Sequence, residues 1–177
     1  MQGKKRQAVL LSLIEAMLKE DSWAGETHVQ KCCYFLQEAL GVPLEFEFIL
    51  YKHGPFSFDL RDELEEMVGD LIIEYKPQYP YGPSMTPGET AERVKERFPR
   101  TIGIWQRKVE FVAKRLATHD VTWLERVGTA LYVLRERALQ DEQAAARVHE
   151  LKPHISLDSA RTAIREVKKI LEEAKAL

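Results

Sequence analysis

The segment at residues 51–60 constrains the fold most, because it ends one regular element and begins another. Gly54 and Pro55 break the preceding element, and the side-chain oxygen of Ser57 or Asp59 can cap a helix that follows. Three rings and an imidazole lie close to this break: Tyr51, His53, Phe56 and Phe58. Because exposed aromatic side chains make good anchors for a protein partner, this segment favours a binding surface over a catalytic site.

Apolar residues at three- and four-residue spacing predict helices over most of the chain. The predicted helices are 5–19, a second that begins after Gly25 with Thr27 as its cap and ends at Gly41, then 57–70, 88–98, 104–117, 122–139, 140–151 and 157–176 with Ser156 as its cap. The last of these is strongly amphipathic, which would allow a homodimer.

Two stretches predict strands, and a loop rich in proline and glycine follows the second. Residues 44–51 begin with alternating polar and apolar side chains, which indicates a half-buried strand or an extended edge. Residues 71–75 read as a strand before a loop at 77–87 with a short return strand at 84–86. Because proline cannot donate to a ladder, the hairpin should be short and ragged.

Helix, strand, loop, strand and helix follow one another in the order of a winged helix. The predicted fold class is therefore mainly α with a small β element. A winged-helix-like module at 1–98 precedes a helical bundle at 99–177, and the two pack as one compact unit.

Composition limits the functional classes. The chain has 177 residues, 45% hydrophobic content and a formal net charge of -2, so it can bury a core but carries no global basic field. Cys32 and Cys33 are the only cysteines and are adjacent, which predicts free thiols in a reducing cytoplasm. No apolar window approaches the roughly 20 residues of a spanning helix, so no membrane role is expected.

Catalytic patterns are missing from the sequence. It has no glycine-rich phosphate loop and no nucleophile elbow, and its histidines never stand four residues apart around a helical glutamate. We therefore expect no enzyme, no catalytic residue, no metal and no cofactor. Two alternatives stay open: a reactive thiol beside Lys31 and His28 in place of buried cysteines, and an acid-base pair of His53 and Asp59 in place of a turn histidine.

The third predicted helix is acidic. Seven carboxylates between residues 59 and 74 face one cation: Asp59, Asp62, Glu63, Glu65, Glu66, Asp70 and Glu74 against Arg61. Phosphates would repel such a face, so it is either a solvated helix face or a surface for a basic protein partner. Basic clusters lie at 4–6, 93–100 and 107–115. Acids are interleaved with the last two, so a solvated surface is expected, with DNA contact as the alternative.

Four segments together are similar to a known family. Residues 29–35, 51–57, 123–132 and 151–156 resemble, in order and spacing, motifs of the Panacea antitoxin domain family, which includes SocA-like antitoxins and YwgA-like proteins. The resemblance implies a mainly helical, winged-helix-like binding module whose antitoxin members neutralise toxin proteins. The proline-rich loop departs from a tidy wing.

The matching positions are the expected family signature: Lys31, Tyr34, Tyr51, Lys52, His53, Gly54, Pro55 and Phe56. Together with Asp59, Glu65 and Glu66, they are the residues that we expect to bind a partner. The leading hypothesis is a non-enzymatic protein-binding module of antitoxin or adaptor type, with a protein partner such as a toxin. The alternative is a winged-helix transcriptional regulator that binds DNA.

Overall fold

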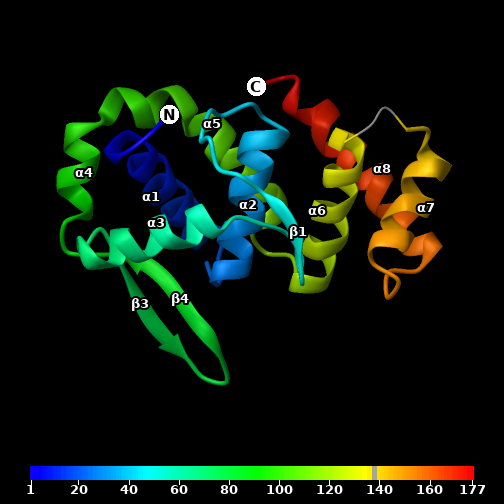
Figure 1. Ribbon diagram of the computed structural model, residues 1–177. Coiled ribbons are helices and arrows are strands. Elements are labelled where there is room, and N and C mark those ends of the chain that lie inside the picture. The colour runs from blue at the N-terminus through cyan, green and yellow to red at the C-terminus, as the bar shows by residue number, and fades with distance from the viewer. Residues whose placement is uncertain (137–138) are drawn as a thin grey trace.

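The computed structural model describes residues 1–136 and 139–177 and is mainly helical, with two small antiparallel sheets of two strands each (Figure 1). The elements, in chain order, are α1 Lys4–Lys19, α2 Glu26–Glu38, β1 Ile49–Tyr51, β2 Gly54–Phe56, α3 Phe58–Gly69, β3 Ile73–Gln78, β4 Tyr81–Pro87, α4 Ala91–Arg97, α5 Pro99–Leu116, α6 Val121–Glu136, α7 Asp141–Leu151 and α8 Leu157–Ala174. This confirms the predicted fold class of mainly α with a small β element. The winged-helix comparison stays a prediction.

Most helix ends fall near their predicted positions, and three differ. Gly25, not Thr27, is the N-cap of α2. The helix α5 begins at Pro99 instead of 104, because proline fits the first helical position, where no N–H bond is lost. The helix α4 begins at Ala91 instead of 88. The predicted helix 122–139 runs into residues 137–138, which lie outside the described residues.

The hairpin of β3 and β4 is longer than predicted. Most of the predicted loop at 77–87 is strand, and β4 alone has seven residues. The register shifts between Lys76 and Gln78, so Pro77 lies at an irregularity where the ladder does not need its N–H. The prolines therefore made the hairpin irregular without making it short.

The predicted strand at 44–51 is wrong in its first half. Only Ile49–Tyr51 is a strand, although Leu44 and Phe46 are buried as their alternation predicts. Phe46 pairs with a side chain instead of a strand: its N–H donates to Gln37 Oε1 and its carbonyl accepts from Gln37 Nε2, both at 2.9 Å. An amide side chain thus satisfies backbone groups that a sheet would otherwise pair.

The core is continuous across the predicted boundary at residue 98. Helix α1 packs on α5, and α2 packs on both α5 and α6. Side chains from both predicted parts share one buried cluster, with Leu10 and Phe35 on one side and Val112 and Leu131 on the other. The division into two parts stays a prediction, but it does not follow a gap in the core.

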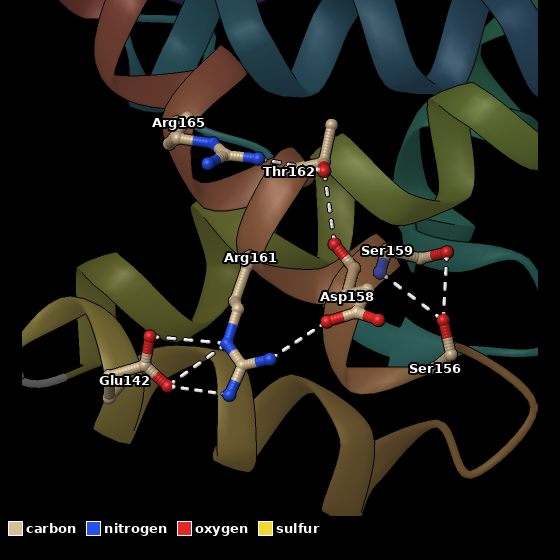
Figure 2. A network of polar contacts seen from close by, with 7 residues as sticks. All are labelled: Glu142, Ser156, Asp158, Ser159, Arg161, Thr162 and Arg165. Atoms are coloured by element: carbon tan, nitrogen blue, oxygen red, sulfur yellow. Dashed lines mark hydrogen bonds and ion pairs between the residues drawn. The ribbon is translucent and has the colours of Figure 1, made fainter.

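Helices α7 and α8 pack on each other at one end of the molecule (Figure 1) and are joined at their surface by an arginine. Arg161 donates to both carboxylate oxygens of Glu142, at 3.0 and 3.1 Å, and to Asp158 at 2.8 Å (Figure 2). Ser156 caps α8, as predicted, by accepting from the N–H of Ser159. The apolar face of α8, on which the homodimer expectation rested, is covered by α6 and α7.

Candidate functional site

A tight hairpin presents the segment that the sequence singles out. Strands β1 and β2 pair antiparallel, with Tyr51 opposite Gly54, so Lys52 and His53 form the exposed tip. Gly54 has φ 85°, and a Cβ there would lie 3.3 Å from the carbonyl oxygen of Glu125. Only glycine combines this left-handed backbone with so close an approach.

Gly54 and Pro55 serve as a buried attachment of the hairpin to α6. Both residues are buried, and a Cβ at Gly128 of α6 would lie only 3.0 Å from Cδ of Pro55. The proline ring therefore occupies the space that a side chain at 128 would need. These two signature residues hold the hairpin in place and offer no surface to a partner.

Ser57 connects the hairpin to α2 and α3. Its hydroxyl caps α3 by accepting from the N–H of Leu60 at 3.2 Å, which settles the choice between Ser57 and Asp59 as cap. The Gln30 side chain donates to the Ser57 carbonyl and accepts from its N–H, both at 2.9 Å. Because both backbone groups are buried and paired, the start of α3 has a fixed position.

Three rings next to this framework form one group, here named the aromatic cluster: Tyr51, Phe56 and Phe58. Tyr51 and Phe58 are exposed, and Phe56 is half-buried. Their centroids lie 5.1 to 5.7 Å apart. Tyr51 is 44% and Phe58 41% exposed, and the guanidinium of Arg61 lies 5.0 Å from the Phe58 ring centroid. Residues two apart at a helix entry usually diverge, but here the turn at Ser57 brings Phe56 and Phe58 to one side.

A group of charged residues lies under the hairpin. Lys152, between α7 and α8, donates to the carbonyl oxygens of Tyr51 and Lys52 at 2.5 and 2.6 Å and lies 3.3 Å from Oε1 of Glu125. Nε2 of His154 lies 3.2 Å from the same carboxylate oxygen. The hairpin tip is thereby tied to residues about 100 positions away in sequence.

Lys31 and Tyr34 are buried, in contrast to the tip. Lys31 is 1% exposed and makes no hydrogen bond or ion pair within residues 1–136 and 139–177. Burial lowers the pKa of Lys31 to about 8, an effect that Glu125 opposes and Lys152 strengthens. Tyr34 is 2% exposed, and the centroid of its ring lies 4.9 Å from the ring centroid of Phe48. These two signature positions belong to the framework.

The acidic face of α3 divides into two parts. Glu63 pairs with Arg6, while Glu66 accepts from Gln7 and lies 3.8 Å from Lys4, so residues of α1 neutralise the inner part. On the outer part, Glu65 accepts from the hydroxyl of Tyr75 at 2.8 Å, and Asp59 makes no hydrogen bond or ion pair with any described residue. Glu65 and Glu66 therefore face different surroundings.

The groups of the enzyme alternatives make no hydrogen bond or ion pair with one another among the described residues. Cys32 and Cys33 are free and fully buried, and burial raises the pKa of both, that of Cys32 to about 12. His53 lies at the exposed hairpin tip, and Asp59 is exposed on α3. In the part of the chain that is described, no three His, Cys, Asp or Glu side chains gather as a metal site. None of its helices has the length and apolar character to cross a membrane.

Sequence reasoning missed Glu125, Gly128 and Lys152, which support the hairpin from elements far along the chain. All three do fall within the segments that carry the family resemblance, 123–132 and 151–156. The spacing of Phe58, Arg61 and Glu65 along one helix face could have indicated the outer surface of α3. No protein-family model matches this chain, and a comparison with curated proteins finds no match.

Proposed function

We propose that this chain is a non-enzymatic protein-binding module of antitoxin or adaptor type that docks a protein partner on the aromatic cluster. The observation that carries the proposal is the exposure of Tyr51 and Phe58 on a framework that is otherwise buried and paired. The resemblance to Panacea-domain antitoxins suggests a toxin as the partner. The two free cysteines suit action in a reducing cytoplasm.

The cluster has the composition of an interface anchor. Tyrosine and arginine are enriched at positions where truncation costs an interface about 2 kcal/mol or more. Phe58 lies against both Tyr51 and Arg61, and all three side chains are partly open to solvent. A partner that covered them would remove apolar surface from water.

The framework lowers the entropic cost of docking. The bonds from Lys152 hold the hairpin tip, and the Gln30–Ser57 pair holds the start of α3. Preorganised anchors lose little conformational freedom on binding, so more of the contact energy appears as affinity.

Affinity purification of the tagged protein from its native cells tests the proposal. The test variant is Phe58→Ser, and the matched control is Leu157→Ser, which removes an apolar side chain of the same 41% exposure from the start of α8. We expect one stoichiometric protein to co-purify with the wild type and Leu157→Ser and to be lost, by roughly tenfold or more, from Phe58→Ser. Equal recovery with both variants, or no stoichiometric partner at all, contradicts the proposal.

A DNA-binding function is the second candidate, because three exposed arginines near α4 have no carboxylate partner among the described residues. They are Arg93, Arg97 and Arg100. Against it, the outer face of α3, which would enter the major groove in a winged helix, carries Asp59, Asp62 and Glu65. Nuclease-sensitive nucleic acid in the same purification, removed by salt and unaffected by Phe58→Ser, would favour this function.

A further inference from the structure

A groove of about 740 Å³ opens where the β3–β4 hairpin meets the starts of α2 and α6. Figure 1 shows the hairpin projecting from the body beside these helix ends. The hairpin is fixed there, because the N–H of Met85 donates to the Ala24 carbonyl at 3.0 Å and Gly25 bridges Ser84. A groove of this volume accommodates a ligand of several residues.

Aromatic and apolar side chains form much of the wall. Trp23 and Tyr75 contribute rings, and Met85, Pro83 and Val121 complete this part of the lining. The Trp23 indole N–H donates to the Pro83 carbonyl at 3.4 Å, so this ring is held against the hairpin. Such faces attract cations through their π electrons.

Three carboxylates lie among these rings: Glu26, Glu65 and Asp120. The described lining contains no lysine or arginine. Among the described residues, Glu65 accepts from the Tyr75 hydroxyl alone. Asp120 accepts from the backbone N–H of Trp123, at the start of α6, at 2.7 Å. Each carboxylate therefore keeps lone pairs for a ligand.

The neighbouring bases offset this charge only in part. His28 lines the groove, but burial lowers its pKa, so the ring is neutral at pH 7. Lys31 lies close enough to Glu26 for the two charges to interact, yet it is buried behind the start of α2. The groove is thus negative at neutral pH.

We propose that this groove binds an arginine-bearing peptide segment of the protein partner. A guanidinium group can stack on an aromatic ring while its fork donates two hydrogen bonds to a carboxylate, which suits a site that combines Tyr75 and Trp23 with Glu26 and Glu65. The inference rests on the proposed function, because it names the chemistry of that same partner.

The position of the groove agrees with a single extended interface. Phe58 of the aromatic cluster and Glu65 of the groove are seven residues apart on α3, hence on the same helix face and about 10 Å apart along its axis. One partner segment of a few extended residues can therefore contact both.

Titration of the isotope-labelled full chain with a defined probe tests the groove directly. The probe is the acetylated and amidated peptide (Gly-Arg)3, with a counterpart in which citrulline replaces arginine, and NMR follows the Trp23 indole N–H and the Met85 methyl group. We expect saturable shifts with the arginine peptide only. Glu26→Gln/Glu65→Gln should weaken binding by roughly fivefold or more. The control Glu47→Gln/Glu89→Gln, which removes two exposed charges elsewhere, should change it by less than about twofold.

Equal binding of the citrulline peptide, or equal affinity of the groove variant and the control, overturns the groove proposal. Purification of the natural partner separates the two proposals. A partner that is lost from Phe58→Ser but binds Glu26→Gln/Glu65→Gln as tightly as wild type removes the groove and leaves the proposed function. A partner unaffected by Phe58→Ser removes the proposed function, whatever the peptide does.

Discussion

Two exposed surfaces of this protein differ in how far their side chains find partners within the chain. On the α7–α8 surface, Arg161 forms bonds with Glu142 and Asp158, so the charges are paired within the chain (Figure 2). On the β1–β2 and α3 surface, Tyr51 and Phe58 are exposed and Asp59 is unpaired by any described residue. The first surface pairs these charges within the chain, whereas the second leaves two rings and a carboxylate exposed, and the proposed docking rests on this difference.

The difference extends beneath each surface. Exposed ion pairs such as Arg161–Glu142 contribute about 0–1 kcal/mol, since water and salt screen them. Under the aromatic cluster, Glu125 and Lys152 form a pair whose side chains are about nine-tenths buried. This buried pair lies where Lys152 also holds the backbone of the hairpin tip.

The largest expected effect is on stability, from Glu125→Gln. The substitution keeps the shape but removes the charge that faces Lys152, and a buried ion pair broken on one side costs about 3–5 kcal/mol. Urea denaturation should show a loss of this order. A loss below about 1 kcal/mol would mean that the two surfaces do not differ in this respect.

Stability should depend on pH through Lys31, whose pKa falls from 10.5 to about 8 on folding. Between these two pH values the unfolded chain binds more protons, so this group makes the free energy of unfolding rise with pH, by up to about 3 kcal/mol. The rise should be missing from Lys31→Met. Denaturation of both proteins at pH 7 and pH 10 measures this contribution to the free energy of unfolding. If the wild type and Lys31→Met differ in this free energy by the same amount at both pH values, folding does not lower the pKa of Lys31.

Gly128→Ala should destabilise the protein by about 1–3 kcal/mol, because the added Cβ would lie 3.0 Å from Cδ of Pro55. Gly103→Ala on α5 is the matched control, since a Cβ there meets nothing within 4 Å. It should stabilise the protein by about 0.5–1 kcal/mol, as alanine favours a helix. Equal effects at both positions, measured by thermal unfolding, would rule out the Gly128–Pro55 attachment.

The sequence predicted those features that local signals determine. Ser57 and Ser156 cap their helices, and the spacing of apolar residues identified α1 and α8. The roles of Lys31 and Lys152 could not be predicted, because each depends on residues brought close only by the complete fold. Exposure of Phe58 depends in the same way on the turn at Ser57. The length of β4 was missed because residue propensities do not reveal the register shift between Lys76 and Gln78, an irregularity of the kind that tolerates proline.

The smallest effect should come from Glu142→Gln, which removes one partner of Arg161 on the α7–α8 surface (Figure 2). We expect a change in the free energy of unfolding of less than about 1 kcal/mol, and less still at high salt. Urea denaturation at two salt concentrations measures it. A larger loss would show that this surface, too, depends on its charges.

Photo-crosslinking in native cells tests the central claim most directly, since it asks which surface the partner covers. The photoreactive residue p-benzoylphenylalanine replaces Phe58 in one protein and Leu157, of the same 41% exposure, in another. We predict one discrete crosslinked protein at position 58 and none at position 157. No crosslink at 58, or the same products at both positions, would contradict the aromatic cluster as the docking surface.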